Sequence, residues 1–171
     1  MLDSAVFIVR GHPIHRGHEA VIRKASELAK QVIILVGSSF APRTIKNPFT
    51  FEERKSMLLA AFPQLQGRMI ILPLGDFPYD DSKWIASVQT LVSSVTTPTD
   101  KISLIGHSKD SSSYYLKLFP TWGHIEVENV DNINATDIRK RIFEYAIVPP
   151  HMQTNPYKDL SEKVAPIVHF L

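Results

Sequence analysis

Short runs of consecutive apolar residues alternate with longer segments of helical periodicity, and this alternation constrains the fold more than any other feature of the sequence. Strands are expected at residues 5–9, 32–36, 69–72, 101–105 and 125–130. Most of these runs are apolar throughout, which is typical of strands that are buried on both faces of a parallel sheet. The sequence therefore predicts an α/β fold, a Rossmann-like parallel sheet with helices on both faces.

Helical patterns fill the segments between these strands. They are expected at residues 19–30, 50–61, 82–94, 114–119 and 135–145. The second of these begins with a capping box formed by Thr50 and Glu53. A last amphipathic helix is expected at about residues 157–170, and the length predicts a single domain over residues 1–171.

Composition excludes several classes of protein. Hydrophobic residues make up 44% and charged residues 21% of the 171 residues, which is typical of a globular chain with a sizeable core. The net charge is only +2, without a concentrated basic stripe, so a nucleic-acid partner is not expected. The absence of Cys excludes disulfides, thiolate nucleophiles and Cys-ligated metals. We see no signal peptide and no apolar run of the ~20 residues that a membrane span needs, so a soluble, cytoplasmic protein is expected.

Polar segments follow the carboxyl end of each predicted strand. They lie at residues 10–18, 37–47, 76–81, 106–113 and 132–139. In a parallel sheet these ends meet at one edge, and ligands bind in the crevice beyond it. The pattern predicts a binding site at that edge before any motif is considered.

The first of these segments carries three His and two Arg between a strand and the start of a helix. A helix N-terminus offers free N–H groups and positive potential, which suit phosphate. His15 and His18 can donate to phosphate oxygens, and Gly17 lets backbone approach a ligand closely. Two alternatives are a polar turn with a His cap, and a metal site of His12, His15 and His18. No carboxylate joins these three His, and Gly17 breaks their helical register, which argues against the metal.

At this point the sequence resembles a family. Residues 15–18 resemble the H-x-G-H signature of the nucleotidyltransferase superfamily, and residues 134–139 its second, I-S-x-T-x-x-R signature. Residues 37–39 and 44–54 are similar to the G-S … N-P-F-T-x-x-E-R stretch of nicotinamide-nucleotide (NMN) adenylyltransferases of the archaeal type. Residues 79–84 and 106–116 resemble the bacterial branch, in which this domain is often fused to a Nudix hydrolase. We find no Nudix signature and expect either a stand-alone form or the N-terminal domain alone.

The loop before H-x-G-H departs from the family, which usually has Gly-Arg-Phe-Gln-Pro-Phe there. Arg10 and Pro13 are kept, but Val9 replaces the Gly and Gly11 replaces the Phe, so we expect this loop to pack differently. Asn134 stands in place of Ser, and either a helix cap or a ligand contact fits it.

The resemblance implies NAD biosynthesis, in which ATP and NMN give NAD and pyrophosphate by in-line attack of the NMN phosphate on the ATP α-phosphorus. It implies ATP with Mg²⁺ held by substrate oxygens and water, no metal ligand from the protein, and a homo-oligomer. The residues implied as catalytic are His15, His18 and Arg139; those for ATP and its phosphates are Arg10, Gly17, Lys46, Gly106, His107, Asn134 and Thr136; those for NMN are Ser38, Asp81 and Trp84.

Several of these residues have a purely structural alternative. Arg139 to Arg141 could form a solvated helix face, Asp81 could be a helix N-cap, and Trp84 fits the apolar stripe of its helix as well as a nicotinamide platform. His107 and Lys109 follow the fourth strand, where adenine or ribose is expected.

Two other functions remain open. One is another small-molecule nucleotidyltransferase, such as the phosphopantetheine type, and the N-P-F-T-x-x-E-R stretch argues against it. The other is a non-catalytic nucleotide-binding module. The retained His15, His18, Thr136 and Arg139 argue against that alternative.

Overall fold

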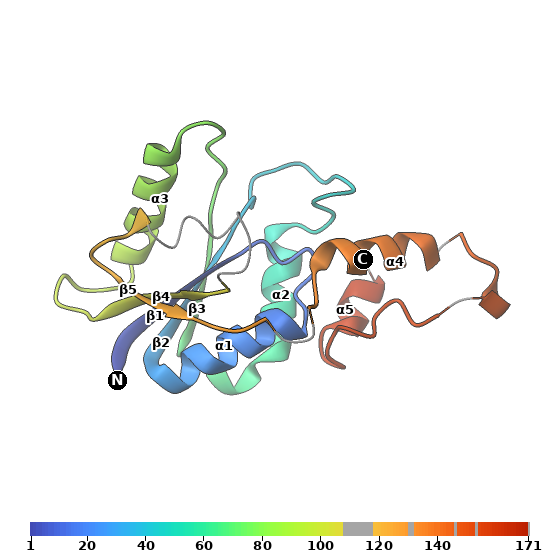
Figure 1. Cartoon of the computed structure of the whole chain (residues 1–171), viewed down its shortest axis with the longest axis horizontal. Coiled ribbons are helices and arrows are strands. Elements are labelled where there is room, and N and C mark those ends of the chain that lie inside the picture. Colours follow the sequence, from blue (N-terminus) through green and yellow to red (C-terminus); the bar gives the residue numbers. More distant parts are fainter. Residues whose placement is uncertain (108–117, 130–131, 146, 153, 171) are drawn as a thin grey trace.

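The computed structural model describes residues 1–107, 118–129, 132–145, 147–152 and 154–170. The strands are β1 (Leu2–Val9), β2 (Ala29–Val36), β3 (Met69–Pro73), β4 (Ile102–Gly106) and β5 (Gly123–Glu126). The α-helices are α1 (Arg16–Leu28), α2 (Phe51–Ala61), α3 (Asp81–Ser93), α4 (Ala135–Tyr145) and α5 (Ala165–Phe170). The alternation of strands and helices confirms the predicted α/β class (Figure 1).

All strands form one parallel sheet in the order β3-β2-β1-β4-β5. The chain builds outward from β1 on one side and then on the other, so the strand order reverses between β1 and β4. The β1–β2 ladder continues to Val9 opposite Val36, whereas the β1–β4 ladder ends at Val6 opposite Leu104. The loops after β1 and β4 therefore flank the position where folds of this class bind their ligands.

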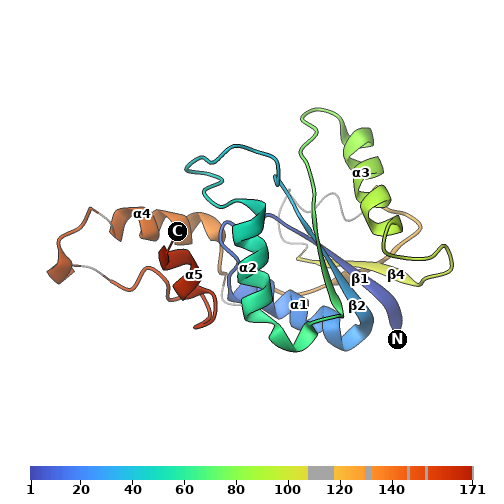
Figure 2. The same cartoon turned by 180° about the vertical axis from the view of Figure 1, so that it is seen from behind.

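Alternate residues of the strands pack into two separate hydrophobic clusters. Phe7 and Ile34 face α1 and α2, which contribute Ile22 and Met57 to the first cluster. The intervening strand residues face the other way, against Val88 of α3. Figures 1 and 2 show α3 on one side of the sheet and α1 with α2 on the other. The sheet is therefore covered by helices on both faces, as the uniformly apolar strands predicted.

The fifth strand is shorter than expected at its carboxyl end. It covers Gly123–Glu126, and the expected extension to residue 130 is wrong for the residues described after Glu126. Val127 still donates its N–H to the carbonyl oxygen of Gly106 (2.9 Å), but its own carbonyl oxygen bonds the His107 ring (2.8 Å). A side chain thus takes the acceptor that would continue the ladder.

The expected C-terminal helix over 157–170 is also corrected. Only Ala165–Phe170 is helical, and residues 157–164 form turns. Pro166 has no N–H to give to a preceding turn, so a helix can contain it only near its start. Leu160, Val164 and Val168 are nevertheless buried in the first cluster, as their spacing suggested.

Smaller boundary differences remain. The first helix begins at Arg16 and gives way to β2 at Ala29, so the expected limits of 19 and 30 are shifted toward the N-terminus. Residues 114–117 of the expected short helix lie outside the described residues. Among the residues described, no helix is long and apolar enough to cross a bilayer.

Candidate active site

His15 and His18 build the first turn of α1 by capping it with their own rings. His15 is the N-cap, and its Nδ1 accepts the N–H of Gly17 (3.1 Å). The N–H of His15 in turn donates to Nδ1 of His18 (3.3 Å), and the two rings stack with centroids 3.6 Å apart. Because each Nδ1 is an acceptor, the proton of each neutral ring sits on Nε2. The pair therefore presents two Nε2–H donors side by side.

Both rings are neutral at physiological pH. Burial, together with His107, lowers the pKa of His15 to about 4, although Asp159 opposes the shift. Burial, His15 and His107 lower the pKa of His18 well below its usual value. The imidazoles can thus donate hydrogen bonds, but positive charge for a phosphate has to come from other groups.

Gly17 is required by this arrangement. A Cβ at residue 17 would lie 3.0 Å from Cε1 and 3.1 Å from Nδ1 of the His15 ring. A side chain there would displace the ring, and the donated N–H of residue 17 would lose its acceptor. The glycine between the two histidines therefore allows the cap to form.

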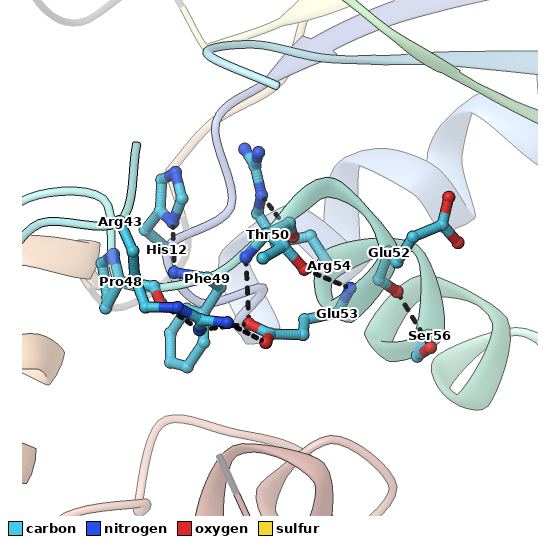
Figure 3. A network of polar contacts seen from close by, with 9 residues as sticks. All are labelled: His12, Arg43, Pro48, Phe49, Thr50, Glu52, Glu53, Arg54 and Ser56. Carbon is cyan, nitrogen blue, oxygen red and sulfur yellow. Dashed lines mark hydrogen bonds and ion pairs between the residues drawn. The ribbon is translucent and has the colours of Figure 1, made fainter. Parts of the chain in front are cut away.

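His12 lies behind this turn and is only 1% exposed. Its Nδ1 accepts the N–H of Phe49 (3.4 Å; Figure 3), and its Nε2 has no partner among the described residues. Burial, with the charges of Arg54, Arg10 and Arg139, lowers the pKa of His12 to about 3. Within the described residues no group of three His, Asp or Glu side chains is arranged to hold a metal ion.

Arg139 is turned toward the loop after β1, not toward solvent. Its Nη1 donates to the carbonyl oxygen of His12 (2.8 Å), and its Nη2 to Oγ1 of Thr136 (3.3 Å). Burial and the charge of Arg10 lower the pKa of Arg139. For Arg139, this excludes the alternative of a solvated face. Arg141 is not solvated either, because it pairs with Asp159.

Arg10 begins the same loop, directly after β1. Its Nη2 donates to Oδ1 of Asn47, whose neighbour Lys46 is exposed. Neither Arg10 nor Arg139 has a carboxylate partner in the part of the chain that the structure describes. Two guanidinium groups near each other and without a counter-charge form a site suited to an anion.

The start of α4 is capped by Asn134. Its Oδ1 accepts the N–H of Asp137 (2.9 Å), and its Nδ2 donates to the Asp137 carboxylate (2.7 Å). This supports the helix-cap alternative for Asn134. Thr136, in the same turn, is exposed beside Arg139. The N-terminus of α4 thus lies close to the loop after β1.

The end of β4 completes the cluster. Gly106 is buried, and Nδ1 of His107 donates to the carbonyl oxygen of Val127 (2.8 Å). His107 is one of the groups that lower the pKa values of His15 and His18, so it lies close enough to interact with both. The predicted residues after β1, β4 and β5 therefore converge at one edge of the sheet. Lys109 lies outside the described residues.

The residues predicted for NMN lie on a different part of this edge. Ser38, after β2, is buried with a left-handed backbone (φ 51°), and its Oγ donates to the Asp76 carboxylate (2.9 Å). The Trp84 ring lies 6.1 Å from Phe119 and packs against the second cluster, as its core alternative suggested. Asp81 is not the N-cap of α3. Asp80 is, because its backbone is non-helical and its carboxylate accepts the N–H of Lys83 (3.0 Å).

Sequence reasoning assigned no role to Asn47, Asp76 or Arg54. Arg54 carried a signal, because it stands three, four and seven residues before Met57, Leu58 and Ala61. All four residues are buried, so an arginine occupies the apolar stripe of α2. The signals for Asn47 and Asp76 were weaker, since each is a polar residue in a polar loop.

A parallel sheet in this order, with a His-x-Gly-His turn opening α1, agrees with the nucleotidyltransferase class that the sequence predicted. The Cytidylyltransferase-like family matches residues 12–72. The chain is 41% identical over 148 residues to the nicotinamide/nicotinic acid mononucleotide adenylyltransferase of Acinetobacter baylyi, covering 85% of this chain and 78% of the relative. It is 31% identical over 146 residues to the nicotinamide-nucleotide adenylyltransferase of Thermococcus onnurineus, covering 84% and 74%. The chain therefore belongs to the nicotinamide-nucleotide adenylyltransferase family.

A solved structure extends the likeness to nearly the whole chain. The bifunctional NMN adenylyltransferase/ADP ribose pyrophosphatase from Francisella tularensis matches with a TM-score of 0.82 and 37% identity, covering 99% of this chain and 50% of that one. A second structure of that enzyme, complexed with AMP and a manganese ion, matches with a TM-score of 0.80. The present chain thus spans half the length of the bifunctional protein.

Proposed function

We propose that this enzyme transfers the adenylyl group of ATP to NMN, giving NAD and pyrophosphate. The observation that carries the proposal is the convergence of four donors at one edge of the sheet. These are the Nε2–H groups of His15 and His18 and the guanidinium groups of Arg10 and Arg139. They suit a polyphosphate, and family membership supplies the nucleotide.

The reaction is an in-line displacement at the α-phosphorus of ATP. An oxygen of the NMN phosphate forms the new P–O bond, and the bond from the α-phosphorus to the bridging α–β oxygen breaks. Pyrophosphate leaves with that electron pair. The second pKa of a phosphate monoester is about 6, so the attacking phosphate is already ionised near neutral pH and needs no general base. The lowered pKa values of His15 and His18 agree with this, because neutral rings act as donors.

The protein then has to align the substrates and offset the negative charge of the phosphates. His15 and His18 would hold the α- and β-phosphates, with the N-terminus of α1 behind them. Arg10, Lys46 and Arg139 would meet the triphosphate and the leaving pyrophosphate. Thr136 would add a donor at the start of α4, so two helix N-termini serve one polyphosphate.

ATP is taken in this proposal as its Mg²⁺ complex. The ion would be held by phosphate oxygens and water, and it would offset part of the negative charge of the phosphates. The manganese ion and AMP in the Francisella structure support a divalent ion beside the nucleotide.

The proposal also covers the second substrate, the location and the assembly of the protein. Ser38, Asp81 and Trp84 would bind NMN. A cytoplasmic location and a homo-oligomer belong to the same proposal.

The experiment is a turnover assay with MgATP and NMN in which NAD and pyrophosphate are both quantified. The expected result is one pyrophosphate for each NAD. Parallel reactions with nicotinate mononucleotide and 4′-phosphopantetheine test the acid form of the substrate and the other nucleotidyltransferase class. A folded protein that binds ATP and forms no NAD contradicts the proposal and favours a non-catalytic module.

A further inference from the structure

Arg54 is the largest of the fully buried side chains that the structure describes, at 1% exposure. It lies on α2, on the face that also buries Met57, Leu58 and Ala61 in the core. Arginine is almost never buried to this extent unless its donors are all engaged. The partners of this guanidinium therefore indicate what it is for.

The guanidinium of Arg54 joins three segments by their backbone carbonyl oxygens. Nη1 donates to Arg10 (2.6 Å) and Gly37 (2.7 Å), Nη2 to Ser38 (3.5 Å), and Nε to Thr50 (3.1 Å). These acceptors lie just after β1, just after β2 and at the N-cap of α2. One side chain thus links the two central loops of the carboxyl edge to a helix.

The first turn of α2 is itself held firmly. Thr50 and Glu53 form a complete capping box, and Glu53 accepts two bonds from Arg43 (2.7 and 2.9 Å). Phe49, one residue before the cap, donates its N–H to His12 (3.4 Å). Figure 3 shows these contacts side by side, together with the bond from Arg54 to Thr50. These contacts fix the first turn of α2, and with it the backbone of Arg54.

We propose that Arg54 is a positioning residue for adenylyl transfer, which holds the loop of Arg10 and the turn of Ser38 at a fixed separation. The inference rests on the proposed function, in which Arg10 serves the ATP phosphates and Ser38 serves NMN. Among the described residues of this edge, the hydrogen bonds of Arg54 go to backbone carbonyl oxygens, so Arg54 would act through the loops that carry Arg10 and Ser38.

A positioning residue such as Arg54 would affect the rate through the alignment of the two substrates. Displacement at phosphorus requires the attacking and leaving oxygens to be in line, and a misplacement of ~1 Å can cost ~10²-fold in rate. Burial and the charge of Arg10 lower the pKa of Arg54 to about 10, so it is still protonated at neutral pH and keeps all its donors. Lysine carries its donors on a single nitrogen and cannot reproduce the planar fork that reaches both strand ends.

Arg68 provides a matched control at the opposite end of β2. Its Nε donates to the carbonyl oxygen of Lys30 (3.0 Å), and its Nη2 to those of Ser26 and Ala29 (3.0 Å each). It therefore also joins backbone segments by carbonyl bonds, but at the edge where the strands begin. Arg68 is exposed, whereas Arg54 is buried, so the comparison concerns kcat and not the size of the stability loss. A purely structural role for Arg54 predicts that Arg54→Lys, like Arg68→Lys, leaves kcat near that of the parent.

The test compares Arg54→Lys and Arg68→Lys in kinetics, thermal melting and backbone hydrogen exchange. Both variants are expected to melt at lower temperature. In Arg54→Lys the kcat for NAD formation should fall ~10²-fold, with the KM values of ATP and NMN changed less than ~3-fold. In Arg68→Lys both kcat and KM should stay within ~2-fold of the parent. Exchange should quicken at residues 10–12 and 37–39 in the first variant, and at residues 26–31 in the second.

An Arg54→Lys variant with the kcat of Arg68→Lys would overturn the proposal. Should that variant not fold, Arg54→Gln, which brings a donor without a buried charge, is measured in its place against the same expectations. Should the parent form no NAD, the proposed function is wrong, and the exchange experiment, which needs no substrate, still decides whether Arg54 holds the two loops. Unchanged exchange at residues 10–12 and 37–39 would then overturn its positioning role.

Discussion

The two edges of the sheet use similar polar residues in opposite ways. At the edge where the strands begin, Lys30 pairs with Asp3 (2.8 Å), and this bond raises the pKa of Lys30 and lowers that of Asp3. At the edge where the strands end, burial lowers the pKa of Arg139 and of His15, and Arg139 lacks a carboxylate partner among the described residues. The first edge satisfies its own charges, whereas the second keeps donors available for a ligand.

This difference indicates that the carboxyl edge gives up some folding stability to keep donors available for a ligand. Exposed ion pairs contribute little and tolerate change. Neutral histidines beside uncompensated arginines are costly unless an anion binds there. The comparison therefore predicts that conditions or substitutions at the carboxyl edge have large effects, and that matched changes at the amino edge do not.

Acid should have the largest effect. The pKa of His12 is lowered to about 3 and that of His15 to about 4 in the fold, against 6.5 when unfolded. The unfolded chain thus binds more protons, and stability is lost as pH falls from about 6.5 toward 4, by ~1 kcal/mol per pH unit for each such His. Denaturant unfolding at pH 7, 6 and 5 measures this slope. His12→Gln should reduce the slope of unfolding free energy against pH by the contribution of one histidine, whereas Asp3→Asn should leave the slope unchanged. Equal slopes in the parent and both variants would refute the account.

Two glycines with left-handed backbone provide the next comparison. Gly11 (φ 68°), at the carboxyl edge, would place a Cβ 2.5 Å from Cδ1 of Ile14, whereas Gly67 (φ 82°), before β3, has nothing within 4 Å. Gly11→Ala adds overpacking to backbone strain and should cost ~3–4 kcal/mol of unfolding free energy, against ~1 kcal/mol for Gly67→Ala. Chemical denaturation measures both. Equal losses would mean that the loop after β1 is less closely packed than described.

His18→Ala tests the proposed role of His18 as a phosphate donor at the carboxyl edge of the sheet. Donors of this kind act mainly in the transition state, so kcat for NAD formation should fall at least ~10²-fold with the fold intact. Steady-state kinetics with circular dichroism checks both parts. His151→Ala, at an exposed position outside the site, is the control and should leave kcat unchanged. Near-normal kcat in folded His18→Ala would remove His18 from the mechanism.

Arg139→Lys should weaken the forward reaction with ATP and the reverse reaction with pyrophosphate together, each by ~10-fold or more in kcat/KM, because both directions would use the proposed phosphate site. Arg141→Ala is the matched control two residues away. It breaks the ion pair with Asp159 and should lower the melting temperature while leaving ATP use near normal. Kinetics in which Arg141 matters more than Arg139 would contradict this assignment.

Trp84→Ala has the smallest expected effect and decides between two roles. Stacking on a base or cationic ring is worth ~1–3 kcal/mol, so the KM for NMN should rise roughly tenfold with the KM for ATP unchanged. Trp122, which stacks on Phe119 with centroids 4.7 Å apart, is the control for aromatic packing alone. A loss of stability like that of Trp122→Ala, without a change in KM, would assign Trp84 to the core.

Much of the fold could be predicted because it depends on local pattern. Each of the strands β1 to β5 overlaps a strand predicted from an apolar run. Helix α4 was predicted with its observed bounds of Ala135 and Tyr145. The end of β5 could not be predicted, since it depends on the ring of His107 taking the carbonyl of Val127. That contact joins residues twenty positions apart and leaves no periodic signal.

The site shows the same limit. The His15–His18 motif and its place at a helix start were readable from the sequence. The mutual capping that puts both protons on Nε2 was not, because it depends on ring orientation. Arg54 ends the N-P-F-T-x-x-E-R stretch, but the motif indicated no role for it, since an arginine on a helix normally faces solvent. Only its carbonyl partners revealed what it holds together.

The most direct measurement is a crystal structure with a non-hydrolysable ATP analogue and NMN. The account predicts the α- and β-phosphate oxygens within hydrogen-bond distance of Nε2 of His15 and His18, with the guanidinium groups of Arg10 and Arg139 facing the phosphates. A nucleotide bound elsewhere, or Arg139 pointing to solvent beside a bound triphosphate, would contradict it.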